Sequence, residues 1–110
     1  MHNLKTAVEL IKKGYIYDYP IKGGSGKSYN DAIIIDIIAW SMFVRIEYEI
    51  VDFLSIHIGK LLKVRQQKLR KQNDKIYDVL SIEEVSLDKD KYIIDIYFDV
   101  TDCWNKKNKK

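Results

Sequence analysis

The clearest alternation of apolar and polar residues lies near the C-terminal end of the chain. Even positions from 92 to 100 are apolar or aromatic, whereas the odd positions from 93 to 101 include Asp95 and Asp99. This period of two predicts a strand over residues 92–101, with a buried even face and an odd face toward solvent. We expect Cys103 and Trp104 to end the ordered part of the chain.

Residues 40–58 carry two conflicting patterns. The segment from Val44 to Ile50 alternates with period two, but the longer window has a broad apolar stripe at helical spacing. Nineteen residues without Gly or Pro exceed a typical strand, and Gly59 is suited to end a helix. The length therefore favours a helix over residues 40–58, although a strand over 44–50 stays open.

Three further segments complete the predicted order of elements. Asn3 can cap a helix over residues 4–13, and the β-branched run from Ile33 to Ile38 predicts a first strand. Asn73 and Asp74 suit the positive φ of a tight hairpin turn. Together these elements predict an α+β fold, in which two helices pack on a small, mainly antiparallel sheet that ends in a three-stranded meander.

The length and the charge distribution indicate one domain with separated charges. The chain has 110 residues, which we divide into a single domain over 1–105 and a basic, disordered tail over 106–110. Residues 60–75 carry seven bases and one acid, a net charge of +6, whereas residues 76–104 carry eight acids and two bases, a net charge of −6. In a hairpin, Lys63 and Arg65 would lie near Glu83 and Glu84.

The glycine-rich segment from Gly23 to Ser28 invites comparison with a phosphate-binding loop. That loop needs a further glycine where this chain has Ile21, and a helix directly afterwards, whereas here the β-branched run follows. We therefore predict a turn that binds no nucleotide.

The residue types favour a non-enzymatic protein without a metal or another cofactor. His57 has no second His or Cys at ligand spacing, and we find no pairing of a nucleophile with a base. Asp95 and Asp99 lie about 13 Å apart along an extended strand, too far to act alone on one substrate atom. The single Cys103, the lack of a long apolar run and an N-terminus without an apolar leader predict a cytoplasmic protein with no membrane partner.

Several motifs together resemble a family of small bacterial proteins. In that family a Gly-Gly-Asp-Gly-Ser-Ser loop precedes an Ala-Ile/Val-Ile-Ile strand, and a Tyr-Tyr-Asp-Val strand precedes a closing Tyr-Phe-Asp-Ile-Thr strand. The matching segments here are 23–28, 31–35, 47–48, 76–80 and 97–101, within a resemblance that covers residues 22–104. Ser25 replaces the loop Asp and Lys27 replaces a Ser. The family resembles the immunity partners of polymorphic or contact-dependent inhibition toxins.

That resemblance implies a protein that binds and neutralises a cognate toxin domain. The acidic C-terminal segment suggests that the toxin domain is basic, because domains that attack nucleic acid must hold a polyanion. The candidate contacts are Glu83, Glu84, Asp95, Tyr97 and Asp99, with the loop tyrosines Tyr17, Tyr19 and Tyr29 as secondary candidates. The alternative is a small nucleic-acid-binding module that uses residues 60–75 and the lysine tail; we expect it to be the weaker explanation, because pairing with the acidic strand would compensate the basic charge.

Overall fold

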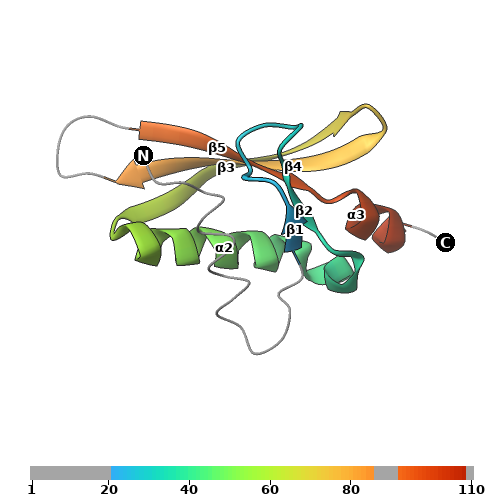
Figure 1. The fold of residues 1–110 in the computed structure, drawn as a ribbon, viewed down its shortest axis with the longest axis horizontal. Helices are drawn as coiled ribbons and strands as arrows, with labels where there is room; N and C mark the ends of the chain where they lie inside the picture. The colour runs from blue at the N-terminus through green and yellow to red at the C-terminus, as the bar shows by residue number, and fades with distance from the viewer. Residues whose placement is uncertain (1–20, 86–91, 109–110) are drawn as a thin grey trace.

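A computed structural model describes residues 21–85 and 92–108 of the chain (Figure 1). These described residues form an α+β fold, with a five-stranded mixed sheet whose strand order is β1-β2-β5-β4-β3. The elements in chain order are β1 (Ile21–Gly23), β2 (Ile33–Ile35), the 3-10 helix η1 (Ile37–Met42), α2 (Phe43–Ile58), β3 (Leu61–Gln72), β4 (Lys75–Val85), β5 (Tyr92–Asp99) and α3 (Thr101–Asn108). The predicted class is confirmed, while the predicted helix over residues 4–13 lies outside the described residues.

The sheet combines antiparallel and parallel pairs. β3 pairs antiparallel with β4, and β4 pairs antiparallel with β5. The sheet continues past β5, because β2 pairs parallel with β5 and β1 pairs antiparallel with β2. β1 and β3 are thus the two edge strands among the described residues, and β3 is much the longer of the two.

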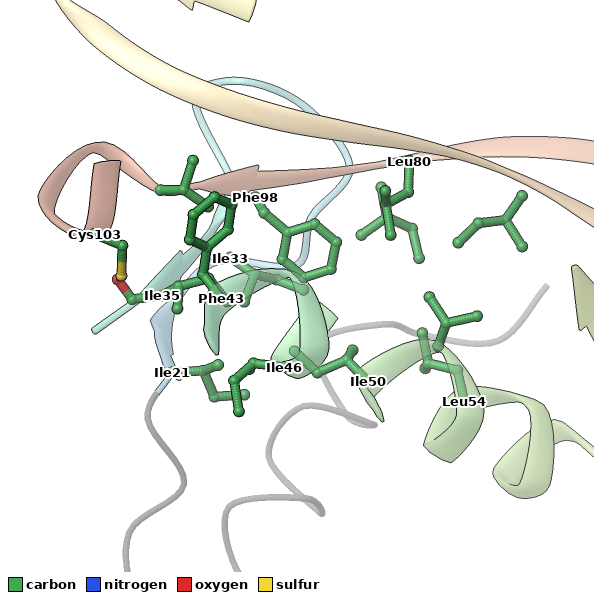
Figure 2. Packing of buried hydrophobic residues seen from close by; sticks show 14 residues of the cluster. Ile21, Ile33, Ile35, Phe43, Ile46, Ile50, Leu54, Leu80, Phe98 and Cys103 are labelled. Atoms are coloured by element: carbon green, nitrogen blue, oxygen red, sulfur yellow. The ribbon is translucent and has the colours of Figure 1, made fainter. Parts of the chain in front are cut away.

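The helices cover one face of this sheet. In Figure 1, α2 and α3 lie on the same side of the strands, and the loop between β1 and β2 rises on the other side. Figure 2 shows Ile46, Ile50 and Leu54 of α2 directed toward the sheet, where Leu80 and Phe98 are fully buried. Burying such a side chain contributes roughly 1.5–3 kcal/mol, so this contact is the main source of stability for the described fold.

The two sheet faces follow from the strand register. Positions 78, 80, 82 and 84 of β4 lie opposite 98, 96, 94 and 92 of β5, and these side chains share the face toward α2, the helix face. The other parity forms the outer face, which carries Tyr77, Val79, Ser81 and Glu83 of β4 and Ile93, Asp95, Tyr97 and Asp99 of β5.

The first predicted strand is shorter than its apolar run. β2 ends at Ile35, and the chain then turns into η1 rather than extending to Ile38. On its β5 side, β2 pairs only with Phe98 and Asp99, where β5 ends, so β5 supplies no ladder partner beyond this point. β-branched composition does not hold a strand without such pairing, because β propensity depends on the neighbours. The helix predicted over residues 40–58 also begins later than expected, because residues 37–42 form the 3-10 helix η1 and α2 starts only at Phe43.

The last predicted strand begins at Tyr92 as expected but ends earlier than predicted. Tyr92, expected in the core, is 56% exposed, since the buried positions of β5 begin only at Ile96. At the other end β5 stops at Asp99, and α3 begins at Thr101. The ordered chain therefore continues past Trp104, and α3 extends to Asn108 within the segment expected to be a tail.

Two predicted turns are confirmed. Gly59 ends α2 in the left-handed conformation with a φ of 68°, and its N–H donates to the Ile56 carbonyl. Asn73 and Asp74 join β3 to β4 with φ values of 52° and 63°. The hairpin that they close has a register shift between Val64 and Gln66.

Candidate functional site

The loop between β1 and β2 lies against the outer face of the sheet through an aromatic cluster. The Tyr29 ring packs edge-on against two rings of the sheet, with centroids 4.9 Å from Tyr77 and 4.8 Å from Tyr97. The Tyr97 N–H also donates to the Gly26 carbonyl at 2.8 Å. Tyr29 and Tyr97 are half-buried, so the cluster keeps some surface that a partner can contact. Tyr17 and Tyr19 lie outside the described residues.

The glycines of this loop have structural roles of their own. Gly26 has a φ of 83°, and a Cβ there would lie 2.9 Å from Ile96 Cγ2. A Cβ on Gly24 would lie 2.3 Å from the Asp31 carbonyl oxygen. The N–H groups of both glycines form hydrogen bonds at the loop: the Gly26 N–H donates to the Asp31 carbonyl, and the Gly24 N–H donates to the Ala32 carbonyl. The prediction that a strand follows the loop is confirmed, and the absence of nucleotide binding stays a prediction.

Two carboxyl groups are buried against each other between α2 and β4. Glu47 is 0% exposed and Asp78 is 1% exposed, each on the side facing the other layer. Burial, followed by a hydrogen bond and a charge interaction with Asp78, raises the pKa of Glu47 from 4.5 to about 11. As two carboxylates, the pair would leave both Glu47 oxygens and Asp78 Oδ1 without a donor. A proton kept on Glu47 removes the repulsion between two buried carboxylates and provides a hydroxyl that can donate to Asp78.

The carboxyl pair continues into a short polar network at β3. Gln67 Nε2 donates to Asp78 Oδ2 at 2.6 Å, and the Tyr48 hydroxyl donates to Gln67 Oε1 at 3.3 Å. No residue of this network was among the predicted site residues. A signal was present in the sequence, because Asp78 has the same parity as the apolar residues Leu80 and Ile82, and a carboxyl group on such a face needs a polar partner.

Glu83 and Glu84 point to opposite faces of β4, and both pair with bases. Glu83 is 8% exposed on the outer face and accepts from Arg65 Nε at 2.8 Å. Glu84 lies on the helix face, where the Lys60 ammonium approaches it at 2.7 Å. The expected pairing of basic β3 with acidic β4 is confirmed for this part of the hairpin.

The three candidates on β5 share the outer face but differ in exposure. Asp95 is exposed and accepts from the Ser81 hydroxyl at 2.7 Å. Tyr97 belongs to the aromatic cluster. Asp99 was expected to be solvated, but it is only 7% exposed. Its carboxylate accepts hydrogen bonds from the Thr101 hydroxyl and N–H, and these bonds hold the start of α3. The Lys75 ammonium lies 3.8 Å from the same carboxylate.

The far part of β3 has a different charge environment. Lys68, Arg70 and Lys71 lie opposite Val79, Tyr77 and Ile76, which carry no charge. None of these three bases forms an ion pair within residues 21–85 and 92–108. Positive charge is therefore unpaired on this part of the hairpin. By contrast, three of the acidic residues that led us to expect a basic partner, Glu83, Glu84 and Asp99, form ion pairs within the chain.

Cys103 is a further residue with reactive chemistry. Cys103 is buried, and its thiol donates to the Asp36 carbonyl at 3.2 Å. Burial, with the negative charges of Asp102 and Asp36, raises the pKa of Cys103 to about 11, which disfavours the reactive thiolate. Over the described ranges, no three His, Cys, Asp or Glu residues come close enough to hold a metal ion.

Comparisons with protein-family models, with curated proteins and with solved structures found no match to this chain. In the part of the chain that the structure describes, no helix is both long and apolar enough to cross a bilayer.

Proposed function

We propose that this chain is a non-enzymatic binding protein of the immunity type, which neutralises a cognate bacterial toxin domain by covering it. The observation that carries the proposal is β3, a strand of 12 residues at the edge of the described sheet, with every residue from Arg65 to Gln72 exposed. A long exposed edge strand is a ready template for another chain, and proteins protect such an edge by covering it, shortening it or placing charged side chains on it. β3 is long and exposed, and its Lys and Arg side chains disfavour pairing with a like-charged strand but not with an acidic one, which supports a role in protein recognition.

The outer face beside β3 supplies side chains suited to such an interface. Asp95 is exposed, and Tyr97 with Tyr29 offers half-buried aromatic surface, the residue type that often anchors interfaces. Glu83 belongs to the same face, although Arg65 already pairs with it. We therefore propose Asp95, Tyr97 and Tyr29 as the contact residues of this face, with Glu83 at its border. Glu84 and Asp99 serve the internal contacts described above.

Binding rather than catalysis is the proposed activity, because the pair of carboxyl groups most capable of acid–base chemistry is closed to substrate. Glu47 and Asp78 lie between α2 and the sheet, and neither is more than 1% exposed. A general acid or base has to come within hydrogen-bonding reach of its substrate. The proposed place of action is the cytoplasm of the cell that makes the toxin.

Co-expression with the toxin domain encoded beside this chain tests the proposal. The expected result is that the wild-type protein binds the domain and restores growth. Asp95→Lys should weaken binding and protection, whereas Asp52→Lys, on the exposed side of α2, should leave both unchanged. A wild-type protein that is folded but neither binds the domain nor protects the cell would refute the immunity function.

A further inference from the structure

The two halves of the β3–β4 hairpin differ in how their charges are paired. Near α2, Lys60 contacts Glu84 and Arg65 contacts Glu83, so positive and negative charges compensate each other. Beyond the register shift, from Gln66 to Gln72, the bases have uncharged neighbours across the ladder. We call residues 66–72 the distal half of β3. Every residue of the distal half is exposed.

The bases of the distal half occupy both faces of the strand. Lys68 and Arg70 share the parity of the outer face, because they pair with Val79 and Tyr77, whereas Lys71 lies on the other side. Leu69, between them, is 45% exposed and adds apolar surface. A ligand that follows the backbone of this strand would therefore meet positive charge on each of its sides.

The backbone of the distal half is also available along one edge. β4 pairs with β3 on one side only, so alternate N–H and C=O groups of β3 point away from the described sheet. An extended chain can form a further ladder with these groups, and pockets or charges beside the strand then set its specificity. A second copy of β3 is disfavoured as that chain, since it would bring Lys and Arg side chains close to one another.

We infer that the distal half of β3 is the docking site for an acidic, extended protein segment, which adds to the sheet as a further strand. Asp or Glu at alternate positions of that segment would lie opposite Lys68 and Arg70. The inference rests on the proposed binding function and specifies the chemistry of the partner at this edge. A nucleic acid is less suited, because a single-stranded ligand prefers a continuous basic groove with aromatic side chains on which its bases stack, and residues 66–72 contain no aromatic residue.

The test is an NMR titration of the full chain with synthetic peptides, and it requires no toxin. The probe is a capped eight-residue peptide that alternates Glu and Val, compared with a peptide that alternates Lys and Val. We expect the acidic peptide to shift the amide signals of residues 66–72 and to slow their exchange with solvent, and the basic peptide to leave these signals unchanged. An acidic peptide that leaves the signals of residues 66–72 unchanged would overturn the inference.

Charge reversal at the docking site sharpens this test. Lys68→Glu combined with Arg70→Glu should weaken binding of the acidic peptide at least tenfold and create binding of the basic peptide. Lys22→Glu combined with Lys27→Glu makes the same change in net charge at exposed positions near the other edge strand, and it should have little effect.

A third probe, an oligonucleotide of 15 thymidines, separates the two classes of partner. If it shifted the same amides at lower concentration than the acidic peptide, and competed with that peptide, the edge would be a nucleic-acid site and the inference would be wrong. Failure of the peptide titration leaves the toxin co-expression result intact, so the two proposals can fail independently.

Discussion

The helix face and the outer face of the sheet treat polar groups in opposite ways. On the helix face Glu47 and Asp78 are almost fully buried, and a proton on Glu47 lowers the free-energy cost of burying two carboxyl groups together. On the outer face Asp95 is exposed, and so are Lys68 and Arg70 along the edge, although Glu83 and Asp99 of that face are buried and paired within the chain. The helix face thus uses its polar groups inside the fold, while Asp95 and the bases of the edge lie where a partner can reach them.

The largest expected difference between the faces concerns packing on β5. Phe98→Ala should lower the free energy of unfolding by about 3–5 kcal/mol, because Phe98 is fully buried beneath α2 and its removal leaves a cavity. Ile93→Ala, on the outer face of the same strand, should cost about 0.5 kcal/mol or less, since Ile93 is 60% exposed. Denaturant unfolding measures both variants. Similar losses for the two would contradict the assignment of the faces.

A second difference is the dependence of stability on pH. In the folded protein the pKa of Glu47 is about 11, against an ordinary value of 4.5, so between these values the folded state holds a proton that the unfolded state has lost. The stabilising contribution is fully present below about pH 4.5 and declines as the pH rises, by at most about 1.4 kcal/mol per pH unit.

Glu47→Gln should remove this decline, because an amide keeps a donor toward Asp78 and does not ionise. Unfolding in urea at pH 5 to 9 measures the slope, with Asp52→Asn on the exposed side of α2 as the control. The explanation is wrong if wild type and Glu47→Gln have parallel pH profiles.

A smaller effect is expected for the aromatic cluster on the outer face. Tyr29→Ala removes two edge-on ring contacts, each contributing about 0.5–1.5 kcal/mol, so the expected loss is about 1–3 kcal/mol. Amide exchange in residues 24–31 should also become faster. Tyr29→Phe keeps the ring and should retain most of the stability. An unchanged exchange rate in Tyr29→Ala would show that other contacts hold the loop on the sheet.

The smallest expected effect concerns nucleotides. Calorimetry with ATP and Mg²⁺ should give no saturable heat, because the N–H groups of Gly24 and Gly26 are occupied within the loop and β2, rather than a helix, follows it. Lys27→Ala should be indistinguishable from wild type. Micromolar binding that this substitution abolishes would show that the loop holds phosphate.

Local patterns in the sequence determined several features of this protein. The apolar stripe and Gly59 predicted α2, and Asn73 with Asp74 predicted the hairpin turn, because each signal depends on residues close together in the chain. The sequence also predicted that Arg65 lies near Glu83, but counting residues back from the turn would place Arg65 opposite Ile82, and the register shift between Val64 and Gln66 is what brings it beside Glu83.

Other features depended on contacts between segments far apart in the sequence. The chain alone could not indicate that β2 lies parallel to β5, or that this pairing ends at Ile34, because both depend on where β5 lies and stops. Likewise, Glu47 and Asp78 meet only when α2 packs across β4, and this burial raises the pKa of Glu47. The sequence thus determined α2, the hairpin and their local turns. Tertiary structure decided the extent of β2 and which charges are paired inside the fold or remain at its edge, because these depend on strand order and on the packing of one layer against another.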